Sequence, residues 1–434
     1  MPSDCTERIP RKSLCTLLIY VLLCPAMYYL HSLATQNVFL CGSFQQTTDV
    51  KVVVFVTYGS GGSAKLRGEL LAQALNAEVS TSLADIKPWS AFQIPALELN
   101  VKIPKRVDVC IVVKSTRNTH ALKKLDAVET CRDHGAITLY DVIDNEPMLA
   151  LLENVTPDQN LPLNFDFVLT QSKRLAFKLG TYRAAVLYHH HSNPGIRTSP
   201  NYVRGHVRRI GFLAGHPKNA LTEREYVLLD EALRRAAPDS SHLSFAVILQ
   251  NASLNGSPQT AVVRGPEQHQ ECRMRRSGHK MMQYDDTGQV LYHNSRLITC
   301  TDMAVVWPAD RYRIIEKPTT TERPLTRFIF WLSHGVPIIA YNYTAYREVI
   351  NDHDYRLIGD SAPSLVVDSI DELEHSAKLI MASAEARVRL RAKGLQIARR
   401  FTIDKSAIRL LEILTMVLSR FPKATTVLSE LQCK

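Results

Sequence analysis

Residues 52–56 read Val-Val-Val-Phe-Val and are followed by Gly59-Ser60-Gly61-Gly62, and this stretch decides the fold class. An unbroken apolar run of this length predicts a strand buried on both faces, as in parallel sheets covered by helices. In residues 64–76, after the glycines, apolar side chains recur at helical spacing. The globular part of the chain therefore opens with a strand, a tight turn and a helix.

The same alternation continues along the chain. Apolar runs that predict strands occupy residues 52–56, 109–113, 136–142, 165–170, 184–188, 209–214, 245–249, 303–307 and 336–340. Patterns that predict helices lie between them, and a linker rich in Pro and Gly divides the series at residues 192–206. The expected class is α/β, with two Rossmann-like doubly wound domains over residues 51–195 and 206–418.

The first 50 residues differ from the rest. Arg8, Arg11 and Lys12 precede an apolar stretch, and no charged residue occurs between Lys12 and Asp49. About 20 apolar residues span a bilayer, and cationic flanks stay in the cytosol. We expect a cytosolic tail (1–12), a transmembrane signal anchor (13–34) and a stem (35–50). The alternative is a cleaved signal peptide ending near Ser32-Leu33-Ala34.

Composition excludes several classes. The chain has 434 residues, of which 45% are hydrophobic and 22% charged, and this is incompatible with disordered or collagen-like proteins. The formal net charge of +10 suits phosphate-bearing ligands, polyanions or membrane surfaces. Nucleic acid is not an expected partner of a body that faces a lumen.

Sequons and cysteines agree with a luminal body. N-x-S/T sequons begin at Asn154, Asn251, Asn255 and Asn342. Six cysteines follow the anchor, at positions 41, 110, 131, 272, 300 and 433, and their even number permits disulfides without fixing the pairs. Cys110 lies in an apolar run, so we expect a buried thiol there. No C-x-x-C pair is present, which argues against a zinc knuckle.

Loops after strands carry the candidate site residues, because ligands bind outside the carboxyl ends of doubly wound sheets. Gly59, Gly61 and Gly62 fit a turn that lets backbone approach a diphosphate. A dinucleotide is the alternative ligand of this turn. We expect Asp144 to act as a base or to position substrate, with a helix cap or Asx turn as the structural alternative.

The segment 316–340 predicts an anion site. A loop with Lys317 leads into an apolar helix near Pro324, and Thr321 or Glu322 is expected to cap that helix. Thr326, Arg327 and the free N–H groups of the helix start would bind phosphate oxygens, together with Lys317 and with Lys218 after the 209–214 strand. The alternative is a solvated charged loop.

Two further clusters receive structural interpretations. His189, His190 and His191 are consecutive, so their side chains alternate in direction and suit a place at the domain junction better than a shared metal ion. Six cations between Arg387 and Arg400 predict a solvated helix face.

In order along residues 51–418, these segments resemble the GT-B glycosyltransferases, especially the retaining, family 4-like group. The matching segments are 59–62, 141–144, 166–172, 317–318, 335–340, 347–350 and 386–401. The resemblance implies a nucleotide-sugar donor bound by the second domain and an acceptor bound by the first. It places Glu322 near the donor sugar and the catalytic centre.

The chain departs from that family at one position. The family often carries a second glutamate eight positions after the first, and this chain has Phe330 there. A phenyl ring cannot accept hydrogen bonds from a ribose, so this interaction with the donor must differ or be absent.

The sequence therefore predicts a membrane-anchored hexosyl- or related transferase. Its expected donor is UDP- or GDP-linked, its acceptor is a glycan, lipid or protein, and no metal or other cofactor is expected. The expected location is a single-pass type II membrane protein of the Golgi or the ER lumen. The alternatives are a noncatalytic GT-B-like binding module and a nucleotide-dependent oxidoreductase.

Overall fold

The computed structural model describes residues 50–58, 65–78, 89–114, 125–143, 146–156, 159, 161, 165–191, 206–214, 223–239, 243–249, 263–264, 301–308, 322–357 and 364–421. Within these ranges, no helix combines the length and the apolar character needed to cross a bilayer. The predicted tail (1–12), the anchor (13–34) and all of the stem except residue 50 lie outside the described residues. They stay predictions.

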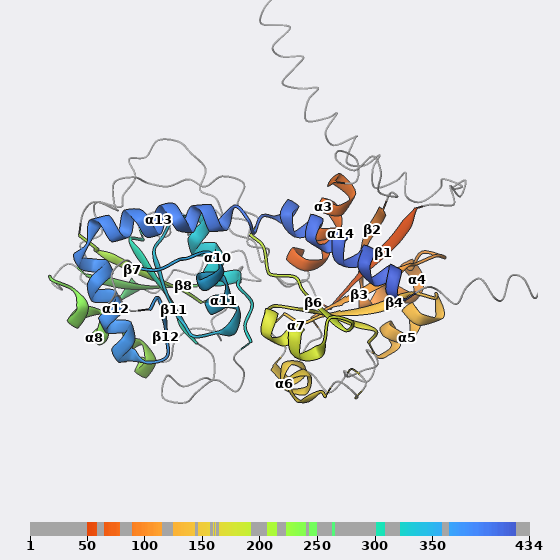
Figure 1. The fold of residues 1–434 in the computed structure, drawn as a ribbon, viewed down its shortest axis with the longest axis horizontal. Helices are drawn as coiled ribbons and strands as arrows, with labels where there is room; N and C mark the ends of the chain where they lie inside the picture. The colour runs from red at the N-terminus through yellow and green to blue at the C-terminus, as the bar shows by residue number, and fades with distance from the viewer. Residues whose placement is uncertain are drawn as a thin grey trace, which may run out of the picture. The chain divides into compact units, whose positions relative to one another are not determined.

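The first lobe is built on a six-stranded parallel sheet (Figure 1). Its strands are β1 (Lys51–Thr57), β2 (Trp89–Pro95), β3 (Val109–Val113), β4 (Ile137–Asp141), β5 (Phe167–Thr170) and β6 (Ala184–Val186), in the spatial order β2-β1-β3-β4-β5-β6. Its helical segments are η1 (Lys65–Glu69), α3 (Leu70–Glu78), η2 (Ala96–Glu98), α4 (Leu99–Lys102), α5 (Leu125–Asp133), α6 (Glu146–Asn154) and α7 (Lys173–Leu179).

The second lobe has its own six-stranded sheet. The strands are β7 (Arg209–Ala214), β8 (Ser244–Leu249), β9 (Val263–Arg264), β10 (Met303–Val306), β11 (Ile338–Tyr341) and β12 (Val366–Val367), in the order β12-β11-β10-β7-β8-β9. Only the β8–β9 pair in it is antiparallel. The helices are α8 (Glu223–Ala236), α10 (Thr326–Ser333), α11 (Thr344–Asp352), α12 (Ile370–Ala382) and α13 (Ala384–Ala398). The two strand orders confirm the expected pair of doubly wound sheets.

The last helix, α14 (Ile403–Arg420), belongs to the first lobe by its packing. Its apolar face joins one core cluster with Val53, Phe55 and Leu139 of the first sheet, and Figure 1 shows the helix lying along that lobe. The sequence placed residues 403–418 in the second domain. The structure differs, because the apolar stripe of α14 is buried against β1, β3 and α3.

Three strands were not predicted from the sequence: the two-residue strands β9 and β12, and the longer strand β2. Strand β2 reads Trp-Ser-Ala-Phe-Gln-Ile-Pro and lies at the edge of the first sheet, next to β1. An edge strand is partly open to solvent and tolerates polar residues and proline, so it lacks the continuous apolar run that marks β1 or β3.

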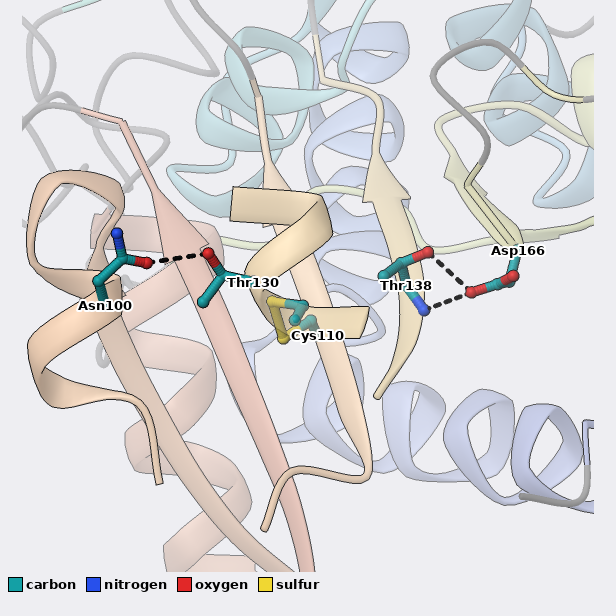
Figure 2. Close-up of a disulfide and its surroundings, with 6 residues drawn as sticks. Asn100, Cys110, Thr130, Thr138 and Asp166 are labelled. Atoms are coloured by element: carbon teal, nitrogen blue, oxygen red, sulfur yellow. Dashed lines mark hydrogen bonds between the residues drawn. A yellow bond between two sulfur atoms is a disulfide. The ribbon is translucent and has the colours of Figure 1, made fainter. Parts of the chain in front are cut away.

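Aspartates fix neighbouring strands at their amino ends in both lobes. The Asp108 carboxylate accepts a hydrogen bond from Val52 N (2.8 Å), and that of Asp166 accepts from Thr138 N and from its hydroxyl, both at 2.7 Å (Figure 2). In the second lobe, Asp302 accepts from Arg208 N (2.8 Å) and Arg209 N (2.9 Å). Each carboxylate satisfies N–H groups that the sheet leaves unpaired.

A disulfide joins Cys110 of β3 to Cys131 of α5 (Figure 2). Both residues are fully buried. The expectation of a buried free thiol at Cys110 is therefore wrong, although its burial is confirmed. The run of apolar residues gave no sign of the partner, which approaches from a helix 21 residues later.

Candidate functional site

Glu322 lies just before α10 and is almost completely buried, with 1% of its surface exposed. Its Oε1 accepts hydrogen bonds from Arg174 of α7, from Nε at 3.2 Å and from Nη2 at 2.9 Å. Burial raises the pKa of this carboxyl group, and the hydrogen bonds from Ser172 and Arg174 oppose that rise. A carboxylate of the second lobe is thus held by a cation of the first.

The sequence explains why Arg174 stands at this place. Asp166 fixes the start of β5, and Ser172 ends the following turn by capping α7, since its hydroxyl accepts from Leu175 N at 3.1 Å. Arg174 is therefore in the first turn of a helix that begins directly after a strand. The 166–172 segment singled out in the sequence sets up this geometry.

Glu348 of α11 holds the same helix start from the second lobe. Its Oε2 accepts from Lys173 N at 2.7 Å and its Oε1 accepts from Arg174 N at 2.9 Å. The Tyr188 hydroxyl donates to Oε2 at 2.8 Å, and burial together with Glu348 raises the Tyr188 pKa. Lys173 Nζ pairs with Asp352 at 2.6 Å. Three carboxylates thus meet the first turn of α7.

Helix α10 begins later than predicted. Its N-cap is Leu325, and no side chain caps the helix start. The expectation that Glu322 caps α10 is wrong. Glu322 lies three residues before the N-cap Leu325, and its carboxylate is turned toward Arg174.

Thr326 and Arg327 occupy the first turn of α10, and both are half-buried. Burial raises the pKa of Tyr346 to about 12, and the charges of Arg327 and Arg323 oppose the rise, so both cations lie near this phenol. Tyr346 stacks on Phe328 with ring centroids 5.2 Å apart, and its hydroxyl donates to Pro324 O at 3.2 Å. Aromatic packing therefore fixes the segment that carries Arg327.

Phe330 occupies the position at which the family that this sequence resembles often carries a second glutamate. It is buried, its ring centroid lies 4.6 Å from that of His334, and it packs edge-on against Trp331. His334 Nδ1 bonds to Phe330 O at 2.8 Å, and burial lowers the His334 pKa to about 4. At this position the second lobe therefore presents an apolar ring beside a neutral imidazole.

The carboxyl end of the first sheet holds a buried ion pair. Arg67, in η1, donates from Nε to Asp141 Oδ2 and from Nη2 to Asp141 Oδ1, both at 2.7 Å. Its guanidinium also donates to Tyr188 O at 3.0 Å and Leu187 O at 3.2 Å. Gly68 allows η1 to approach β1, because a Cβ there would lie 2.5 Å from Thr57 Cγ2. Arg67 thereby links η1, the end of β4 and the segment after β6.

The three histidines lie in that last segment and are buried. Burial lowers the pKa of each, and the charge of Arg67 adds to the effect at His189 and His190. His191 N donates to Phe401 O at 2.9 Å, and its Nε2 bonds to Ala398 O at the same distance. His191 therefore joins the first lobe to the end of α13. In the described part of the chain, no group of three His, Cys, Asp or Glu side chains is arranged to hold a metal ion.

The described residues include only part of the predicted site. They contain Glu322, Thr326 and Arg327, which lie close together around the start of α10. Asp144, Lys218, Lys317, Gly59, Gly61 and Gly62 lie outside the described residues. The sequence reading missed Arg174 and Glu348 as site residues, although the segments 166–172 and 347–350 were both singled out.

The cation run is also only partly as expected. Arg387 is buried and its Nη1 donates to Ile380 O and Met381 O, both at 2.8 Å, at the end of α12. It stabilises the end of that helix instead of lying on a solvated face. Arg399 and Arg400 are exposed, as predicted.

No protein-family model matches the chain, and no curated protein is detectably similar in sequence. Among solved structures, the glycosyltransferase WaaG of lipopolysaccharide biosynthesis is similar with a TM-score of 0.44 and 10% identity, over 84% of this chain and 99% of that one. A trehalose-6-phosphate synthase is similar with a TM-score of 0.47 and 10% identity, over 84% of this chain and 99% of that one. The N-terminal domain of Candida albicans trehalose-6-phosphate phosphatase is similar with a TM-score of 0.48 and 9% identity, over 87% of this chain and 98% of that one.

These likenesses concern the fold, and no residue role is taken from them. The strand orders by themselves give the class: two doubly wound α/β lobes in one chain.

Proposed function

We propose that this chain is a glycosyltransferase that moves a sugar from a nucleotide-sugar donor to an acceptor on the first lobe. The observation that carries the proposal is Glu322, a buried carboxylate of the second lobe held by Arg174 of the first. Buried, oriented acceptors of hydrogen bonds are what a sugar hydroxyl requires for recognition. The junction of two doubly wound lobes is also where such folds bind their ligands.

Departure of the nucleotide requires stabilisation of a diphosphate. Arg327 and Thr326 lie in the first turn of α10, where backbone N–H groups are also free for an anion. We include Lys317, Lys218 and the turn with Gly59, Gly61 and Gly62 in the donor site. Cations and N–H groups neutralise the leaving diphosphate, so transfer without a metal is part of the proposal.

The acceptor hydroxyl must lose a proton during transfer. Asp144 is our candidate for the group that accepts it or that orients the acceptor. It follows β4, whose last residue, Asp141, is fixed by Arg67.

The proposed setting is the lumen of the Golgi or ER, with the chain anchored by residues 13–34. The disulfide between Cys110 and Cys131 supports it, because such bonds persist in oxidising compartments. Asn154 is exposed at the end of α6, which suits a glycosylated sequon. UDP and GDP sugars are the proposed donors, and a glycan, lipid or protein is the proposed acceptor.

Phe330 supports a second candidate, a noncatalytic binding module. Its ring is packed against Trp331 and His334, so no carboxylate is available there for a ribose. Such a module would bind a sugar or a nucleotide without turnover.

A donor screen with the full-length chain in detergent tests the proposal, with released nucleotide as the readout. We expect release from one UDP or GDP sugar, and we expect Lys317→Ala and Glu322→Gln to reduce it strongly in folded protein. Binding of UDP or GDP without release would favour the noncatalytic module. Binding of NAD alone would contradict both candidates and favour an oxidoreductase.

A further inference from the structure

Arg174 contacts the second lobe twice, through its side chain and through its backbone. The guanidinium bonds to Glu322 Oε1 from Nε and Nη2, and the backbone N–H donates to Glu348 Oε1 at 2.9 Å. Glu322 is 148 positions away in the chain. Arg174 of α7 therefore forms these hydrogen bonds only when the two lobes are in contact.

The backbone of Arg174 is held in place independently of its guanidinium group. Ser172 caps α7, and Glu348 binds the N–H groups of Lys173 and Arg174. The Tyr188 hydroxyl donates to the same carboxylate and so holds it in place. A long flexible side chain loses less entropy on pairing when its backbone is already immobile.

The charge of Arg174 favours the ionised form of the buried Glu322 carboxyl group. The groups that face Glu322 are Ser172 and Arg174 of the first lobe, Glu348 of α11 and the phenol of Tyr188. Arg174 is the cation among them, while Glu348 has the same charge as Glu322 and raises its pKa. A buried carboxylate that loses its cation tends to take up a proton.

We propose that Arg174 is a positioning residue supplied by the first lobe, which orients the Glu322 carboxylate for the donor sugar only when the lobes are in contact. The inference rests on the proposed function, because it assigns Glu322 to the donor sugar. Arg174 itself is half-exposed and needs no contact with the reacting atoms. It acts through the direction and the charge of Glu322.

The first experiment needs no turnover. Glutamate labelled with ¹³C at the side-chain carboxyl gives a resonance for Glu322, assigned by its loss in Glu322→Gln, and its shift is followed against pH. Arg174→Gln should move this titration to higher pH, whereas Arg174→Lys should restore part of the difference. Lys173→Gln is the matched control, since Lys173 pairs with Asp352 and its loss should leave Glu322 unchanged.

The second experiment measures transfer with the donor found in the screen. Arg174→Gln should lower kcat by about 100-fold, the size of effect that a catalytic group misplaced by about 1 Å can have, while affinity for the bare nucleotide stays the same. The acidic limb of its pH profile should shift to higher pH in parallel with the Glu322 titration. Thermal unfolding should show that Arg174→Gln, Arg174→Lys and Lys173→Gln all fold.

Two results would overturn the inference. One is a Glu322 titration that is identical in the wild type and in Arg174→Gln. The other is a shifted titration with unchanged kcat, which would reduce Arg174 to a structural ion pair. If the wild type releases no nucleotide from any sugar donor, the proposed function fails, and with it the role of Glu322 on a sugar.

Discussion

The two lobes share a fold class but place their switch points differently. In the first sheet the order β2-β1-β3-β4-β5-β6 reverses direction between β1 and β3, as in flavodoxin-like folds. In the second sheet it reverses between β7 and β10, which gives the Rossmann order with an antiparallel β9. One architecture has therefore been built by two different windings in one chain.

The lobes differ more at the carboxyl ends of their strands. The first lobe buries the Arg67–Asp141 ion pair there, next to two buried histidines. The second lobe surrounds the start of α10 with packed aromatic rings and one buried carboxylate, Glu322. The comparison teaches that the sheet fixes where a site lies, while the side chains after each strand decide its chemistry.

Arg67→Ala is the most damaging change that we predict. It leaves Asp141 buried without its cation and should lower the free energy of unfolding by about 3–5 kcal/mol. Loss of protection from hydrogen exchange should begin in first-lobe peptides around β4 and β6. The double variant Arg67→Met/Asp141→Leu is the control, and it should recover most of the loss because no charge stays buried. A double variant as unstable as Arg67→Ala would show that the pair stabilises the lobe by more than its charge balance.

Removing the disulfide should destabilise the first lobe alone and so increase the difference in stability between the two lobes. Cys110→Ala/Cys131→Ala opens a loop closed over a separation of 21 residues, for which about 3 kcal/mol is expected from chain entropy. Hydrogen exchange should accelerate in β3 and α5, with second-lobe peptides unchanged. Treatment of the wild type with a reductant should reproduce the pattern. Equal acceleration in both lobes would mean that they unfold as one unit.

A pH effect is expected from the second lobe. Burial raises the pKa of Asp302 from 3.8 to about 6, against the opposing N–H groups of Arg208 and Arg209. Between these pH values the folded protein keeps a proton that the unfolded chain has lost, so stability falls as pH rises toward 6 and is level above it. Asp302→Asn should abolish this fall and gain about 3 kcal/mol at pH 7.

Denaturant unfolding from pH 4 to pH 7 measures that effect. Asp371→Asn is the control, because Asp371 is an exposed carboxylate of the same lobe. An unchanged pH dependence in Asp302→Asn would show that the buried carboxyl is ionised throughout.

The smallest predicted change in stability is that of removing a serine helix cap, and each lobe offers one. Ser172 caps α7 in the first lobe and Ser369 caps α12 in the second, each accepting from a backbone N–H three positions on. Either serine changed to alanine should cost about 1 kcal/mol of stability. Ser172→Ala should also alter the Glu322 titration, since its hydroxyl bonds to that carboxyl, whereas Ser369→Ala should not. Identical titrations in both variants would remove Ser172 from the site.

The sequence by itself determined the fold class. The apolar run 109–113 matches β3 residue for residue, because a strand covered on both faces is apolar throughout. It also indicated the segments around Glu322, Ser172 and Glu348 as candidates. These signals are local, and local patterns are what a sequence displays.

Only the tertiary structure decided which distant residues meet. The Arg67–Asp141 pair joins positions 74 apart, and the Arg174–Glu322 pair joins positions 148 apart. The pairing of Cys110 with Cys131, the edge strand β2 and the return of α14 to the first lobe likewise depend on which surfaces are brought together. No periodicity records such contacts, because the free energy that selects them comes from burying whole elements against one another.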